Sequence, residues 1–272
     1  MGALQGIDPP DRDPYQKPFK TSEFGGSNSV SRPVPSAMAE RLIVALDVPR
    51  IDEARRLVER LDGIVSFYKV GLWLAFAQGI DGLIGDLLAA GGKLFLDCKM
   101  LDIPKTVEEG VARAAERGVS FVTVHAEPST MAAAVKGKRD SALKILAVTV
   151  LTSLGDRELQ AAGYRLGADE LVRLRVRQAV GCGCDGIVAS AWDRPDELRR
   201  LASAQQLLVV TPGIRPAGAT IDDHRRAGTP AQAIADGADY LVVGRPIIAA
   251  ADPAASARAI IAEMEQGARA VT

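Results

Sequence analysis

The stretch Lys93-Leu-Phe-Leu-Asp97-Cys-Lys99 decides the fold, because a short apolar run ends in two charged residues. Apolar runs of this length are typical of buried strands in parallel sheets. Seven similar runs occur elsewhere, and each has a closing polar residue, glycine or proline at or beside its end. These closing residues are Asp47, Lys69, His125, Thr152, Ser190, Pro212 and Gly244. The eight runs are Leu42–Val48, Val65–Val70, Lys93–Lys99, Phe121–His125, Ile145–Leu151, Gly186–Ser190, Leu207–Thr211 and Tyr240–Val243.

The spacing of these runs indicates one large barrel. The residues that close successive runs lie 22 to 38 positions apart, near the roughly 30 residues of one strand-helix unit. The intervening stretches are rich in Ala, Leu, Arg and Glu and have helical character. We expect an α/β protein, a single (β/α)8 TIM barrel over residues 39–272. A doubly wound open sheet is the alternative, but no glycine-rich dinucleotide motif follows the first run.

Residues 1–38 differ from the rest of the chain. They hold six of the fifteen prolines and a Gly-Gly-Ser run at residues 25–27, without apolar periodicity. Such a segment buries too little apolar surface to offset its ordering entropy. We expect a disordered tail or a leader segment here.

The composition excludes several classes of protein. Thirty-three basic residues against 34 acidic ones give a net charge of −1, which removes the usual driving force for binding nucleic acid. No apolar run approaches the roughly 20 residues that span a bilayer, and no secretion signal begins the chain. Three cysteines form no disulfide framework. We therefore expect a soluble cytoplasmic protein without nucleic-acid or membrane partners.

The charged residues that close neighbouring runs form the first candidate site. Asp97 and Lys99 are two positions apart, so they share one face of a strand, and Asp47 and Lys69 close the two preceding runs. Asp102 follows just beyond. Active sites of such barrels lie at the carboxyl ends of the strands. A lysine held between carboxylates stays protonated, so it suits an acid or an electrostatic anchor. The alternative is a neutral ion-pair network.

The last two runs lead into candidate phosphate-binding loops. Residues 211–218 and 243–246 contain glycines, which let a ligand approach the backbone closely, and Arg245 can hold a dianion with two hydrogen bonds. Barrels often bind phosphate at this position. A glycine-arginine pair alone is more often an ordinary turn.

From about Arg41 to its C-terminus the chain resembles the orotidine 5′-phosphate decarboxylase family. The matching motifs are Ala45-Leu-Asp47, Tyr68-Lys69-Val-Gly71, Asp97-x-Lys99-x-x-Asp102-Ile-Pro-x-Thr106, Val124-His125-Ala126, Val148-Thr-Val-Leu-Thr152-Ser153, Val210-Thr-Pro-Gly213-Ile-Arg215-Pro and Val243-Gly244-Arg245-Pro246. The resemblance implies a TIM barrel that converts orotidine 5′-monophosphate to UMP and CO2, the last step of de novo pyrimidine synthesis, with no metal and no organic cofactor.

The resemblance also implies residue roles. Lys99 matches the proton donor to the C6 carbanion, and Asp97 matches a carboxylate beside that of the substrate. Asp102 and Thr106 are expected to reach the neighbouring subunit's site in a homodimer. The implied catalytic set is Lys99, Asp97, Asp102 and Lys69. The implied substrate-binding set is Asp47, Lys69, Asp97, Thr106, Thr152, Ser153, Pro212, Arg215, His224, Gly244 and Arg245.

Two positions depart from the family pattern. Lys105 stands where the family usually has Asn, and His224 stands where the phosphate-closing loop usually has Gln.

Thr152 and Ser153 match residues that bind the pyrimidine ring, although their hydroxyls could instead cap the local backbone.

Simpler roles or other functions remain for parts of the pattern. We expect His125 to be a hydrogen-bonded core histidine, and Trp73 and Trp192 to pack helices on the barrel. The nearest rival function is a metal-dependent sugar-phosphate decarboxylase or aldolase, which needs oxygen-rich coordination of Mg²⁺. A non-catalytic nucleotide-binding barrel is a second rival function, and the intact Lys99 argues against it.

Overall fold

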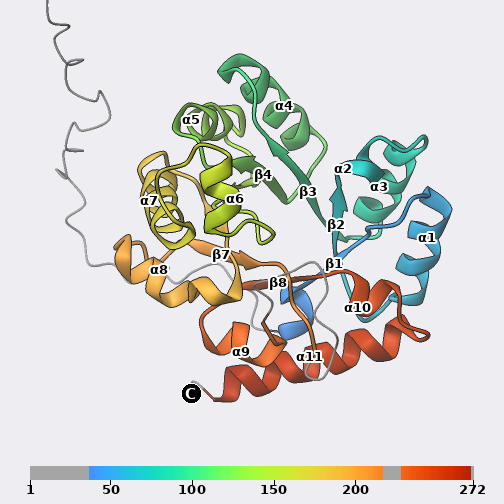
Figure 1. Cartoon of the computed structure of the whole chain (residues 1–272). Coiled ribbons are helices and arrows are strands. Elements are labelled where there is room, and N and C mark those ends of the chain that lie inside the picture. Colours follow the sequence, from blue (N-terminus) through green and yellow to red (C-terminus); the bar gives the residue numbers. More distant parts are fainter. Residues whose placement is uncertain (1–36, 217–227, 271–272) are drawn as a thin grey trace, which may run out of the picture. The chain divides into compact units, whose positions relative to one another are not determined.

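The computed structural model describes residues 37–216 and 228–270, and its eight parallel strands close into a barrel (Figure 1). The strands are β1 (Leu42–Ala45), β2 (Phe67–Gly71), β3 (Lys93–Met100), β4 (Phe121–His125), β5 (Lys144–Val148), β6 (Gly186–Val188), β7 (Leu208–Thr211) and β8 (Tyr240–Val243). Each strand pairs with the next, and β8 pairs with β1. The predicted (β/α)8 barrel is confirmed, and the open-sheet alternative is wrong. The predicted tail lies almost wholly outside the described residues.

Helices connect the strands and cover the outside of the barrel (Figure 1). Proline at the first position starts five of them, where its missing N–H costs no hydrogen bond. The helical segments are η2 (Met38–Arg41), α1 (Ile51–Arg60), α2 (Leu72–Ala75), α3 (Ile80–Ala89), α4 (Pro104–Glu116), α5 (Pro128–Gly137), α6 (Asp156–Ala161), α7 (Ala168–Gly181), η3 (Ala191–Asp193), α8 (Pro195–Leu201), α9 (Pro230–Ala235), α10 (Arg245–Ile248) and α11 (Pro253–Arg269).

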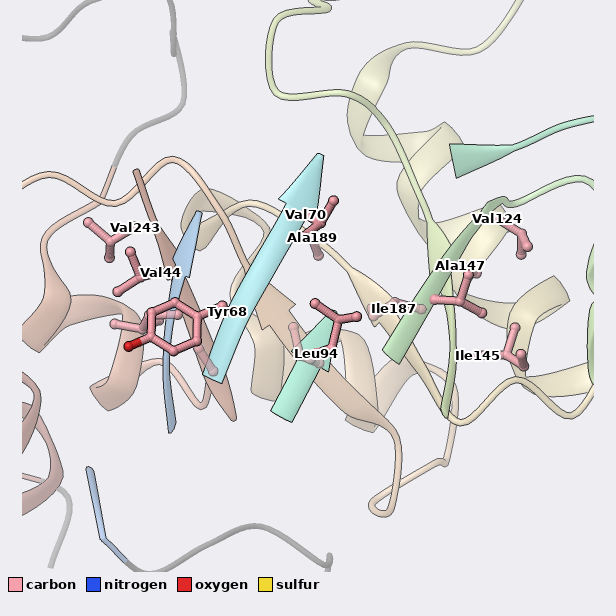
Figure 2. Packing of buried hydrophobic residues seen from close by; sticks show 14 of the residues in the cluster. Val44, Tyr68, Val70, Leu94, Val124, Ile145, Ala147, Ile187, Ala189 and Val243 are labelled. Carbon is pink, nitrogen blue, oxygen red and sulfur yellow. The ribbon is translucent and has the colours of Figure 1, made fainter. Parts of the chain in front are cut away.

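Alternation along the strands divides the buried side chains into two clusters. Outward-facing residues such as Val44, Tyr68 and Val124 belong to the larger cluster, which the helices complete (Figure 2). The inner cluster fills the barrel with aromatic rings, and Phe121 lies edge-on to both Phe67 and Tyr240, with centroids 5.0 and 5.1 Å apart. This packed interior forms the floor beneath the carboxyl ends of the strands.

The same alternation places charged residues directly above that apolar floor. Lys69 follows Phe67 by two positions on β2, and Asp97 follows Phe95 by two on β3, so both share the inner face with the rings below. The interior therefore changes from apolar to charged within two residues of each strand. This change places a polar site at the carboxyl mouth of the barrel.

Strand β3 departs from regular alternation where the site begins. Leu96 pairs with Val122 of β4, but the next pair is Met100 with Val124, so three residues of β3 lie opposite Thr123 alone. Lys99 has a φ of 47° in this bulge. Left-handed backbone costs a non-glycine residue roughly 1–2 kcal/mol and is concentrated at functional sites. The simple alternation expected for Asp97 and Lys99 is therefore replaced by a bulge.

The prediction that both tryptophans pack helices against the barrel is wrong. Trp73 is 59% exposed and Trp192 is 64% exposed. Trp73 lies on the short helix α2, directly after β2, and Trp192 lies on η3, shortly after β6. Both therefore belong to the segments that follow strands, where side chains surround the mouth instead of filling the core.

Candidate active site

Four charged side chains of alternating sign form a continuous chain of ion pairs at the mouth. Lys69 Nζ lies 3.1 Å from Asp47 Oδ1 and 3.5 Å from Asp97 Oδ2. Lys99 Nζ lies 2.9 Å from the same Asp97 Oδ2. The predicted convergence of these residues from β1, β2 and β3 is confirmed by this geometry.

Burial differs along the chain of ion pairs. The side chains of Lys69 and Asp97 in its middle are 9% and 14% exposed, whereas that of Lys99 is 36% exposed and reaches toward the opening. Burial raises the pKa of Asp97, but the charges of Lys69 and Lys99 and hydrogen bonds from Lys99 and Thr123 outweigh it. The pKa of Asp97 therefore lies below its ordinary value.

A cavity of about 270 Å³ opens above the ion pairs. Nine of the predicted site residues line it: Asp47, Lys69, Asp97, Lys99, Thr152, Pro212, Arg215, Gly244 and Arg245. Four basic side chains against two acidic ones give the cavity two excess positive charges. A ligand that carries several negative charges fits this balance.

The two arginines enter the cavity from the loops after β7 and β8. Arg215 is buried and donates one hydrogen bond to the Ile214 carbonyl, whereas Arg245 is exposed at the start of α10. Gly213 has a φ of 75°, a conformation that favours glycine. The carboxyl ends of β7 and β8 thus bring two guanidinium groups to the cavity.

Several predicted residues do not line this cavity. Asp102 and Thr106 are exposed and line a separate cleft on the other side of Lys99, together with Cys98 and His125. Burial, Arg175 and Lys99 lower the pKa of His125. Ser153 is exposed and stays outside the cavity. His224 lies outside the described residues.

No site role was predicted from the sequence for three parts of the site, although Gly71 and Val148 belong to motifs that match the family. Val148, Val150 and Val188 form an apolar wall that periodicity cannot distinguish from ordinary core. Gly71 lies so close to the ion pairs that a Cβ there would be 3.0 Å from Asp47 Oδ1. Its place at the carboxyl end of β2 was the available signal. The third is Thr123, which contacts Asp97.

Within residues 37–216 and 228–270, no group of three or more His, Cys, Asp and Glu side chains could hold a metal ion. None of the helices described there is long and apolar enough to cross a membrane.

An array of ion pairs and arginines at the carboxyl mouth of a closed (β/α)8 barrel defines a TIM-barrel enzyme. The model of the Orotidine 5′-phosphate decarboxylase / HUMPS family matches residues 40–260. The chain belongs to this family.

Relatives and solved structures agree with the family model. Orotidine 5′-phosphate decarboxylase of Afipia carboxidovorans is 54% identical, over 85% of this chain and 97% of the relative. The protein of the same name from Caulobacter vibrioides is 51% identical, over 82% and 97%. The crystal structure of orotidine 5′-phosphate decarboxylase from Lactobacillus acidophilus has a TM-score of 0.72 and 36% identity, over 83% of this chain and 99% of that one.

Proposed function

We propose that the chain decarboxylates orotidine 5′-monophosphate to UMP and CO2, the last step of de novo pyrimidine synthesis, with Lys99 as the proton donor. The observation that carries the proposal is the Asp97–Lys99 pair, 2.9 Å apart, on the wall of a positively charged cavity in a chain of this family. The substrate bears a phosphate dianion and a carboxylate, so its charge complements that of the cavity.

The ion pairs suit the chemistry at C6 of the pyrimidine. When the bond between C6 and the carboxyl carbon breaks, its electron pair stays on C6 and CO2 leaves. The Lys99 ammonium stabilises this developing charge and then transfers a proton to C6, which gives UMP. Lys99 recovers a proton from solvent. Asp97 adds repulsion toward the substrate carboxylate and holds the ammonium in position.

The remaining cavity residues divide the nucleotide among them. Asp47 and Lys69 would bind the ribose hydroxyls, because their ion pair lies at the edge of the cavity nearest β1 and β2. Arg215 and Arg245 would bind the phosphate, together with backbone N–H groups at Gly244. Thr152 and Ser153 are assigned to the pyrimidine ring. Pro212 and His224 are assigned to the phosphate loop.

Exposed apolar residues on the segments that follow β2 and β3 support a homodimer around this mouth. They are Leu72, Trp73, Phe76, Leu101 and Ile103, and each residue is more than half exposed. Three of them line a cleft with Lys69 and Lys99, and large apolar patches mark interaction sites. Asp102 and Thr106 lie within the same segment, outside their own chain's cavity, as residues that serve a partner's site would.

Subunit complementation tests the shared site. Lys99→Ala and Asp102→Asn should each be inactive alone, because each removes one component of every active site. In a mixed dimer, one site combines the intact Lys99 with the partner's intact Asp102. An equal, fully exchanged mixture should then regain about a quarter of wild-type activity. A mixture as inactive as its components would exclude a site shared in this way.

A spectrophotometric assay with orotidine 5′-monophosphate tests the reaction itself. We expect loss of substrate and formation of UMP at a rate that treatment with EDTA leaves unchanged. Activity that EDTA abolishes would instead favour the metal-dependent rival, and UMP binding without turnover would favour a non-catalytic nucleotide-binding barrel. The cytoplasmic location stays a prediction.

A further inference from the structure

Thr123 connects the two charged residues of the bulge through one hydroxyl group. It lies on the inner face of β4, two positions after Phe121, and is fully buried. Its Oγ1 donates a hydrogen bond of 2.8 Å to Asp97 Oδ1 and accepts one of 3.0 Å from the Lys99 backbone N–H. One hydroxyl group therefore donates a hydrogen bond to Asp97 and accepts another from Lys99, two positions further along β3.

The first hydrogen bond fixes the orientation of the Asp97 carboxylate. Both lysines interact with Oδ2, Lys99 at 2.9 Å and Lys69 at 3.5 Å. Oδ1 takes the hydrogen bond from Thr123 instead. Because one oxygen is held by the strand beside it, the other is held where it bridges the two ammonium groups. Without Thr123 the carboxylate could rotate about its Cβ–Cγ bond.

The second hydrogen bond fixes the backbone of the bulge. Three residues of β3 lie opposite Thr123, so regular ladder hydrogen bonds are interrupted there. The Thr123 side chain takes the Lys99 N–H, which supports the positive φ of that residue. Valine has nearly the same shape as threonine but can supply neither hydrogen bond.

From this geometry we propose that Thr123 is a positioning residue, which sets the direction of the Lys99 ammonium through the Asp97 carboxylate and the Lys99 backbone. The proposal rests on the decarboxylation proposed above. Thr123 does not line the cavity, so it acts on the reacting groups only through the two residues it contacts.

Two substitutions at this position separate positioning from packing. Thr123→Val keeps the shape and removes the hydroxyl, and Thr123→Ser keeps the hydroxyl. Thr130→Val is the matched control, because Thr130 is also buried and its hydroxyl makes no hydrogen bond to Asp97 or Lys99. It lies on α5, outside the cavity. The measurements are kcat and KM for orotidine 5′-monophosphate, affinity for UMP and urea unfolding.

We expect Thr123→Val to lower kcat by about tenfold to a hundredfold, the equivalent of one hydrogen bond to a charged group. KM and UMP affinity should stay within about twofold, since phosphate and ribose are bound elsewhere. Thr123→Ser should recover most of the lost kcat, and Thr130→Val should retain wild-type values throughout.

Three results would overturn the positioning role. They are an unchanged kcat in Thr123→Val, a kcat loss that serine does not rescue, and equal losses of kcat and UMP affinity. A wild-type protein without decarboxylase activity would instead refute the proposed function, so the two failures are distinguishable. If Thr123→Val does not fold, the comparison of Thr123→Ser with wild type tests the positioning role instead. A serine variant that folds normally but loses kcat as severely as Lys99→Ala would refute the role of the hydroxyl.

Discussion

Replacing Lys99 by glycine should give a more stable protein than replacing it by alanine. Both changes remove the ammonium, and Asp97 keeps its hydrogen bond from Thr123 and its ion pair with Lys69 in either case. They differ at the backbone, because Lys99 has a φ of 47°. Left-handed backbone costs alanine roughly 1–2 kcal/mol, whereas the flexibility of glycine in the unfolded chain costs about 0.5–1 kcal/mol. The difference favours glycine by up to about 1.5 kcal/mol, with a midpoint of roughly 0.75 kcal/mol.

Urea unfolding of both variants at one protein concentration measures this difference, since an oligomer's stability depends on concentration. Cys98 supplies the control within the same bulge, because its φ is not positive. There, Cys98→Gly should be less stable than Cys98→Ala. A Lys99→Gly protein less stable than Lys99→Ala would refute the argument that the lysine occupies a strained backbone position.

Three other changes have defined outcomes. Burial raises the pKa values of Tyr68 and Tyr240 from 10.0 to about 12, so the unfolded chain loses these two protons at a lower pH than the folded chain does. The urea midpoint of wild type should therefore fall as pH rises from 10 toward 12. The midpoint of Tyr240→Phe should fall less steeply. Arg245→Ala should raise KM by about tenfold to a hundredfold with a smaller change in kcat, because one charge-assisted phosphate contact is lost; an unchanged KM in steady-state kinetics would remove Arg245 from the phosphate site. Gly71→Ala puts a methyl group 3.0 Å from Asp47 Oδ1 and 3.1 Å from Lys69 Nζ, so kcat/KM should fall by about tenfold while the urea midpoint stays near that of wild type.

The barrel could be predicted because its signal is repeated along the chain. Each apolar run closes on a polar residue, a glycine or a proline, and the structure places strands at all eight runs, with β4 (Phe121–His125) and β8 (Tyr240–Val243) matching to the residue. The first and fifth runs were predicted too long. Val48 and Leu151 continue the apolar pattern but follow the strand ends as loop residues, and apolar character alone does not show where pairing stops.

The site could be predicted where it depends on strand ends, and not where it depends on contacts across strands. Asp47 and Lys69 meet because their strands are neighbours, which chain order already implies. The bulge at Lys99 and the hydroxyl of Thr123 depend on the register between β3 and β4. Alternating patterns do not encode that register. Trp73 and Trp192 were predicted to pack helices on the barrel, whereas their places shortly after strands favour exposure.

The most direct test of the central claim compares wild type with Lys99→Ala in the decarboxylation assay and in UMP binding. If the ammonium beside Asp97 supplies the proton to C6, the variant should lose about 10³-fold or more in kcat. Its affinity for UMP should stay close to that of wild type. Wild-type turnover in Lys99→Ala would contradict the account.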